Sequence, residues 1–249
     1  MPFTIAHPAA VMPFLRYQKR FRMDAMILGS MAPDFEYFLR GRPYGICGHT
    51  LPGIVLLDLP LVAVVYFIGR YLVLPVIGPY LPYAFQPKQL RSRHRITAAF
   101  VFAYSALIGV LSHIVWDSFT HIDGAMVEHV AVLDETIRIH GLDIPVYKIL
   151  QHGSTLAGLI AIAWFLFGLY KRHMKAKKPT TLWSIAVFWS ALIVLALSIL
   201  LIWNAISATS APQYGVLVVR CIDSAIISLL ALSAALKVGS VVKRRRGRQ

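Results

Sequence analysis

Three residues of types that commonly bind metals recur at four-residue intervals in the segment SHIVWDSFTH, residues 112–121. An α-helix turns about 100° per residue, so His113, Asp117 and His121 would lie within about 80° of one helix face. The two histidines would be about 12 Å apart along the helix axis, too far for one ion, whereas each is one turn from Asp117. The spacing therefore predicts that Asp117 bridges two metal ions.

Further residues of these types flank the apolar runs of the chain, and the predicted topology places them on the same face of a membrane. A single histidine there is most simply a hydrogen-bonded residue at a helix end, but the whole set favours one or two divalent ions, with Zn²⁺ as the expected metal. The candidate ligands are His7, Asp34, His49, His113, Asp117, His121 and His152. Asp34 and Glu36 are also candidate catalytic bases.

The composition is that of an integral membrane protein. Hydrophobic residues make up 57% of the 249 residues, and the mean hydropathy is +0.64, above the roughly 45–50% apolar content of soluble domains. Five apolar runs approach the roughly 20 residues that cross a bilayer, at 54–68, 97–116, 153–170, 182–203 and 216–236. The first is short, contains Asp58 and Pro60, and could continue past Arg70 toward Val76 as a tilted or broken helix.

The net charge of +14 comes from basic residues that cluster at the ends of these runs, which is a topology signal rather than a sign of nucleic-acid binding. Placing 70–95, 171–178 and the tail from 237 in the cytoplasm satisfies the positive-inside rule, although basic residues within 1–53 oppose this orientation. No signal peptide is apparent. We therefore expect a bacterial cytoplasmic-membrane protein whose metal site faces away from the cytoplasm.

The expected fold class is all-α, a polytopic bundle of about five membrane helices forming a single domain over 1–249. Residues 1–53 would be an interfacial, ligand-bearing segment, 54–170 a bundle with the metal motif, and 171–249 two further spans with a basic tail. Two apolar pieces, 5–15 and 23–32, are too short to cross and read as interfacial or re-entrant helices. Residues 121–152 read as a polar loop, and Arg220 and Asp223 as an ion pair within one helix.

The motifs together resemble a known group. The opening MPFTIAHP, then GSMAPDFEY at 29–37, SHIVWDSFTH at 112–121 and QHGS at 151–154 resemble an uncharacterised bacterial family of multi-pass membrane proteins. That family, a domain of unknown function, resembles the inner-membrane metal-dependent hydrolase-like proteins. More distantly, the order His, Asp, His, His-x-x-x-Asp is similar to the zinc-dependent phospholipase C and single-strand nuclease superfamily.

This resemblance implies ligand roles for His7, Asp34, His49, His113 and Asp117, with His121 and His152 as further candidates. Leu156 stands where those enzymes carry a carboxylate, so the resemblance favours one or two ions over three. It also implies a metal-dependent hydrolase acting at the bilayer surface on a phosphoester or lipid headgroup. A non-catalytic membrane protein with a structural or metal-handling site is the alternative, and a transporter is less favoured because the chain has no internal repeat.

Overall fold

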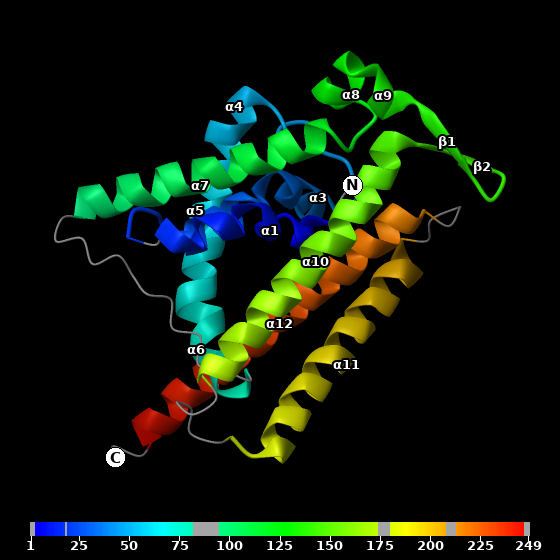
Figure 1. Cartoon of the computed structure of the whole chain (residues 1–249). Coiled ribbons are helices and arrows are strands. Elements are labelled where there is room, and N and C mark those ends of the chain that lie inside the picture. The colour runs from blue at the N-terminus through cyan, green and yellow to red at the C-terminus, as the bar shows by residue number, and fades with distance from the viewer. Residues whose placement is uncertain (1–2, 18, 82–94, 174–179, 208–212, 247–249) are drawn as a thin grey trace. The chain divides into compact units, whose positions relative to one another are not determined.

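The computed structural model describes residues 3–17, 19–81, 95–173, 180–207 and 213–246. Helices dominate this part of the chain (Figure 1). The short N-terminal helices are η1 (Thr4–Ala6), α1 (Pro8–Val11), η2 (Met12–Tyr17), α2 (Met23–Gly29), η3 (Ala32–Asp34) and α3 (Phe35–Arg40). The later helices are α4 (Leu51–Gly53), α5 (Leu59–Ile68), α6 (Leu74–Ile77), η6 (Gly78–Tyr80), α7 (Arg95–Ser118), α8 (Ala125–His129), α9 (Ala131–Asp134), α10 (Val146–His173), α11 (Leu182–Ile206) and α12 (Tyr214–Arg246).

Five helical stretches among the described residues are long and apolar enough to cross a membrane. They are Leu51–Tyr80, Ile96–Ser118, Val146–Lys171, Leu182–Ile206 and Tyr214–Gly239. Each contains one of the five apolar runs, so the predicted all-α class and the number of long helices are confirmed. The helices extend beyond the apolar runs because backbone hydrogen bonding continues into polar residues at the span ends.

The first of these stretches is the longest, and two prolines explain its irregularity. Proline lacks an N–H and its ring clashes with the carbonyl four residues earlier. Wider π-helical turns, Ile54–Asp58 and Gly69–Val73, precede Pro60 and Pro75, and such turns relieve this clash without ending the helix. The predicted extension past Arg70 is therefore confirmed, and the helix continues to Tyr80.

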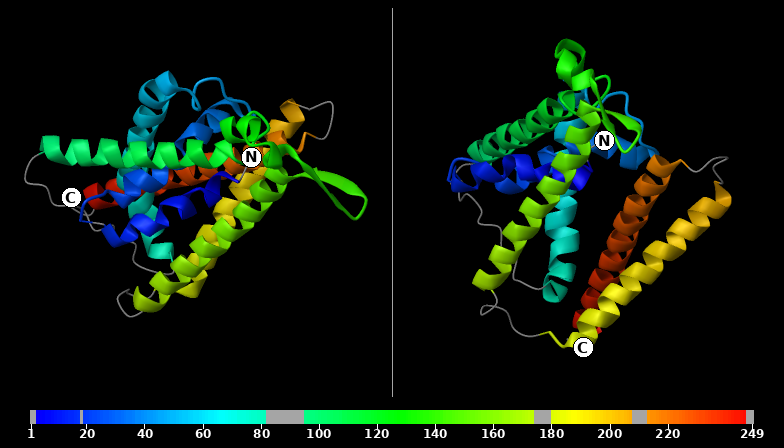
Figure 2. Two further views of the ribbon diagram at one scale, coloured as in Figure 1. Left: turned by 45° about the horizontal axis from the view of Figure 1, so that its top comes forward. Right: turned by 45° about the vertical axis from the view of Figure 1, so that its right-hand side comes forward.

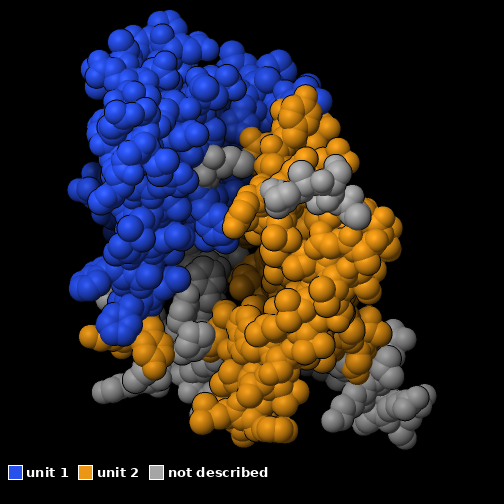
Figure 3. Space-filling model, turned by 90° about the vertical axis from the view of Figure 1, so that its right-hand side faces the viewer, with its two compact units in different colours: residues 1–35, 46–63, 87–169 blue, residues 36–45, 64–86, 170–249 orange. Residues whose placement is uncertain are grey.

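The contacts divide the chain into two compact units (Figure 3), the first comprising 1–35, 46–63 and 87–169. Its core is formed where α2 packs on α7, with Ala25, Ala32, Ile54, Val62, Ala106 and Val110 buried. Gly29 and Gly109 allow this packing, since a Cβ on either would lie 2.2 Å from a backbone oxygen of the facing helix. The predicted interfacial piece 23–32 is thus helical and forms part of a core. That the chain is one membrane domain stays a prediction.

The second unit comprises 36–45, 64–86 and 170–249, in which α11 and α12 lie side by side and antiparallel (Figure 2). The predicted Arg220–Asp223 pair is wrong for the described structure. The Arg220 guanidinium instead donates to Asn204 Oδ1 at 2.7 Å and to the Ser207 carbonyl at 2.9 Å. Ser207 caps the C-terminus of α11, where helix carbonyls lack intrahelical donors and attract a cation.

The segment 121–152, expected as a loop, contains α8, α9 and an antiparallel hairpin of β1 (Thr136–Ile139) and β2 (Leu142–Pro145). His140 and Gly141 turn the hairpin, both with positive φ, 49° and 84°. Positive φ at both central residues is the geometry of the tight turn that matches strand twist. Arg138 and Asp143 are paired across the two strands. The hairpin lies beyond the predicted metal motif and contributes none of its candidate ligands.

Candidate metal centre

Four predicted ligands converge in the first unit. Asp34, His49, His113 and Asp117 each offer one donor atom, and these atoms all lie within 4.8 Å of one another. His113 Nε2 is 3.2 Å from Asp117 Oδ2 and 3.7 Å from Asp34 Oδ1, and His49 Nε2 is 3.5 Å from Asp117 Oδ2. Donors about 2.0–2.2 Å from a tetrahedral Zn²⁺ are about 3.3–3.6 Å apart. The observed separations lie near this range, so the four residues could hold a transition-metal ion.

The orientation of His113 follows from the crossing of α2 and α7. Gly109 lies one turn before His113 and brings the two helices close enough for contact between their backbones. At the end of α2 the Ser30 carbonyl has no intrahelical donor, and His113 Nδ1 lies 2.8 Å from this oxygen. A carbonyl only accepts, so Nδ1 carries a proton, and Nε2 is the nitrogen directed at the other donors, where the neutral imidazole could bind a metal. This arrangement is typical of a metal-binding histidine.

Asp34 and His49 are held beside it by local packing. The Thr4 hydroxyl donates to Asp34 Oδ2 at 2.6 Å, which leaves Oδ1 for the metal. His49 follows Gly48, where a Cβ would lie 2.4 Å from the Pro33 carbonyl. Glycine is therefore required for the loop that contains His49 to approach the turn that contains Asp34. His49 is the most exposed of the four, with 32% of its side chain accessible.

Several buried donor atoms of the site lack a hydrogen-bond partner. They are His7 Nε2, Asp34 Oδ1, His113 Nε2 and Asp117 Oδ1. Buried polar atoms are almost always satisfied, and leaving a charged one unsatisfied costs several kcal/mol. Burial also raises the pKa of Asp34 above its usual value, against the opposing effects of His113 and Thr4. A divalent cation held by the four residues would satisfy the Asp34 and His113 atoms together.

His7 adjoins the group rather than completing it. Its Nε2 is 3.5 Å from Asp117 Oδ1, and its ring stacks on that of His113 with centroids 3.8 Å apart. Burial, followed by the neighbouring His113, lowers the His7 pKa to about 3. The imidazole is therefore neutral at physiological pH, as a metal ligand must be. His7 therefore lies next to Asp117 Oδ1, the carboxylate oxygen that does not face His113 and His49.

The other predicted site residues lie differently. Helix α7 ends at Ser118, so His121 follows it in a turn, and its Nδ1 lies 3.2 Å from the Asp117 carbonyl and 3.6 Å from Asp117 Oδ2. That nitrogen donates to the carbonyl and is not available as a ligand. His152 is exposed and outside the group of four. The Glu36 carboxylate forms an ion pair with Arg40 at 2.7 Å.

Two positioning groups were not predicted from the sequence. Thr4 lies three residues before His7, and its hydroxyl offers no pattern that would link it to Asp34. Ser30 acts through its backbone carbonyl, which any residue could provide. The pair Gly29 and Gly109, which lets the helices approach, is the one signal in the sequence for this contact.

Residues 1–234 match a family model described as a domain of unknown function, DUF4184, and the chain belongs to this family. Membership of an uncharacterised family is thereby confirmed. Comparison with curated proteins and with solved structures found no match. The relationship to inner-membrane metal-dependent hydrolase-like proteins stays a prediction.

Proposed function

We propose that this member of the family binds a divalent transition metal, Zn²⁺ in the first instance, and is a membrane-bound hydrolase acting on a phosphoester or lipid headgroup. Metal binding is supported by one observation, the convergence of donor atoms from Asp34, His49, His113 and Asp117. Several of these buried oxygen and nitrogen atoms have no hydrogen-bond partner. A carboxylate and imidazole donor set suits Zn²⁺ and neighbouring first-row metals.

The proposed hydrolase activity depends on the residues that would surround the ion. A bound divalent metal polarises an ester or phosphoryl oxygen and lowers the pKa of a water. Asp117 provides two oxygens, Oδ2 toward His113 and His49 and Oδ1 toward His7. Of the two carboxylates expected as bases, Glu36 is engaged by Arg40. We therefore assign proton transfer to Asp34, which would accept a proton at Oδ2, the oxygen beside Thr4, while Oδ1 faces the ion.

A non-catalytic role is the second candidate, and the number of donors favours it. Four protein donors close a tetrahedral site, as in structural zinc centres, whereas catalytic sites keep a position for water. The exposed edge at His49 favours the catalytic alternative, because solvent or a substrate can approach from that side. In the structural role His49 would stay bound to the metal, whereas in the catalytic role it would give up its position to water or substrate.

The membrane side of the site is part of the proposal. The basic segments after the first, third and fifth spans favour the extracytoplasmic face for the ends that hold the ligands. In a background with Cys47 and Cys221 replaced by Ser, Ser207→Cys should react with an impermeant thiol reagent in intact cells, and Ala176→Cys should not. The reverse pattern would place the site in the cytoplasm.

The test of the chemistry is a screen of phosphoesters and phospholipids with the metal-loaded protein in nanodiscs. Hydrolysis should stop on addition of a chelator and return with Zn²⁺. Compared at equal Zn²⁺ content, Asp34→Asn should reduce turnover by roughly 10²–10⁴-fold, as expected for loss of a general base, whereas His152→Ala should leave it unchanged. Complete inactivity of protein shown to contain its metal would support the structural role instead.

A further inference from the structure

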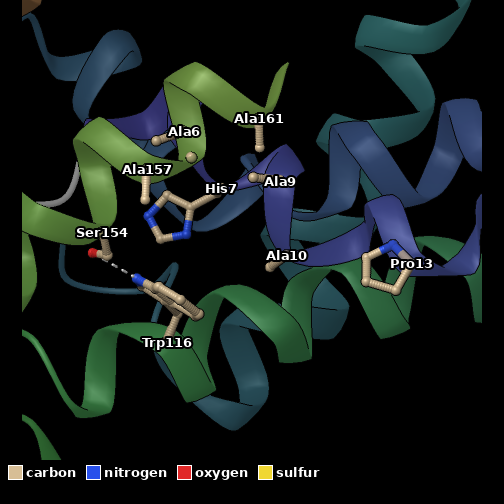
Figure 4. A pocket seen from close by; sticks show the side chains of 10 residues that line it. Ala6, His7, Ala9, Ala10, Pro13, Trp116, Ser154, Ala157 and Ala161 are labelled. Carbon is tan, nitrogen blue, oxygen red and sulfur yellow. Dashed lines mark hydrogen bonds between the residues drawn. The ribbon is translucent and has the colours of Figure 1, made fainter. Parts of the chain in front are cut away.

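An apolar cavity of about 380 Å³ lies in the first unit beside the metal centre (Figure 4). Helices η1, α1 and η2 form one wall. The other wall is formed by the C-terminal end of α7, which precedes the hairpin, and by the N-terminal half of α10, which follows it. Its surface consists largely of small apolar residues, namely Ala6, Ala9, Ala10, Ala157, Gly158 and Ala161. The volume falls within the roughly 300–1,000 Å³ of ordinary ligand pockets.

The cavity adjoins the metal centre through one side chain. The His7 ring lines the cavity, stacks on His113 and directs Nε2 toward Asp117. His7 is only 4% exposed, and Nε2 has no hydrogen-bond partner. Only the imidazole ring of His7 would therefore separate a molecule in the cavity from His113 and Asp117.

The polar groups on the cavity wall leave little for a polar solute to bind. The Trp116 indole N–H donates to Ser154 Oγ at 3.2 Å, and Ser154 Oγ also lies 3.2 Å from the Gln151 carbonyl, to which it donates. None of the described residues that line the cavity is Asp, Glu, Lys or Arg. The occupant that this surface suits is an uncharged hydrocarbon chain, which gains from burial and requires no hydrogen bonds.

The location identifies the source of such a chain. Trp116, Ser154, Ala157, Gly158 and Ala161 belong to helices long and apolar enough to span a membrane. Only 6% of the apolar window of α10 is buried inside the protein, so in a bilayer this helix faces lipid along most of its length. The cavity surface is therefore continuous with a lipid-facing helix.

We propose that this cavity receives an acyl chain of a bilayer lipid and thereby presents the polar end of that lipid to the metal centre. The inference names the substrate class of the proposed hydrolase and rests on that proposal for its chemical part. Binding of the chain itself requires only the cavity. A failure of acyl-chain binding can therefore be distinguished from a failure of the proposed hydrolase activity.

The test uses nanodiscs containing phosphatidylcholine with a photoreactive diazirine in one acyl chain, and maps the labelled peptides by mass spectrometry. Residues 6–13, on the wall opposite α10, should be labelled, whereas labelling of the lipid-facing α10 does not by itself report on the cavity. Ala157→Phe fills the exposed mouth of the cavity and should reduce this labelling by about tenfold, as expected for loss of two or more buried methylenes. The matched control is Ala163→Phe, an equally large change at another exposed alanine of α10, which should label as the unchanged protein does.

Metal content separates the two proposals. Ala157→Phe should retain its Zn²⁺, and the double variant His113→Ala, Asp117→Ala should lose it while 6–13 are still labelled. Labelling that is equal in Ala157→Phe and Ala163→Phe would overturn the inference even if the metal is present. Labelling of 6–13 that Ala157→Phe lowers and Ala163→Phe does not, in a protein that hydrolyses no lipid, would support chain binding and contradict the hydrolase alone.

Discussion

Removing the Thr4 hydroxyl should weaken metal binding while keeping the packing of the N-terminal helices. Thr4 is buried, and its hydroxyl donates to Asp34 Oδ2 at 2.6 Å. Thr4→Val preserves the shape of the side chain but leaves this carboxylate oxygen without a donor. A hydrogen bond to a charged group is worth about 1.5–3 kcal/mol, and loss of such an outer contact lowers metal affinity by roughly 10–100-fold.

The loss should depend on pH with a definite sign. Burial raises the pKa of Asp34, and the Thr4 hydrogen bond lowers it. Without Thr4 the carboxyl holds its proton more tightly, and a proton competes with the metal for Oδ1. The ratio of affinities between the unchanged protein and Thr4→Val should therefore grow as the pH falls from about 8 to about 6.

Competition with a chromophoric zinc chelator measures both effects on purified protein. Thr155→Val is the matched control, because Thr155 Oγ1 accepts from the Phe3 N–H at 3.2 Å and donates to the Gln151 carbonyl at 2.8 Å. It anchors the same N-terminal segment without touching Asp34. Its affinity for Zn²⁺ should match that of the unchanged protein. Equal affinities for Thr4→Val and Thr155→Val, whether both high or both low, would refute the role given to Thr4.

Three further predictions concern the surroundings of the site. Gly109→Ala should push α2 away from α7, displace the Ser30 carbonyl from His113 and release the metal. Gly168→Ala should retain the metal, because a Cβ there meets nothing within 4 Å. The metal content of both variants measures this. The pKa of His7, lowered to about 3 by burial, means that the metal-free protein loses stability as pH falls from about 6.5 toward 3, by up to about 1.4 kcal/mol per pH unit, and thermal unfolding of His7→Gln should show a smaller slope. His49→Ala should lower Zn²⁺ affinity, while His152→Ala should have no effect, as measured by chelator competition; the opposite order would show that the ligands are misassigned.

The helices were predictable because their signals are local. Apolar runs of membrane-spanning length and the interval between His113 and Asp117 depend on residues near one another in sequence. The span ends were less predictable, since hydrogen bonding continues beyond the apolar residues, as in the extension of the first span to Tyr80. The hairpin turn at His140 and Gly141 does have a local signal, a glycine in a two-residue turn between alternating apolar residues. The polar composition of 121–152 concealed it.

The assembly of the site depends on contacts between distant residues, which a single sequence does not reveal. The types of Asp34, His49, His113 and Asp117 indicated a metal, but their convergence depends on the close crossing of α2 and α7. His121 was expected on a helix that instead ends at Ser118. The Arg220–Asp223 prediction was wrong because carbonyl and amide acceptors at the end of α11 lie within reach of Arg220. Spacing along one helix carries no information about such neighbours.

Metal content of the purified protein tests the central claim most directly. Protein prepared without added chelator should contain a divalent transition metal by elemental analysis, and chelated protein should take up Zn²⁺ again. The double variant His113→Ala, Asp117→Ala should contain none, and His152→Ala should contain as much as the unchanged protein. A folded protein that holds no metal and takes up none, or a double variant whose metal content is unchanged, would contradict the assignment of Asp34, His49, His113 and Asp117 as the metal centre.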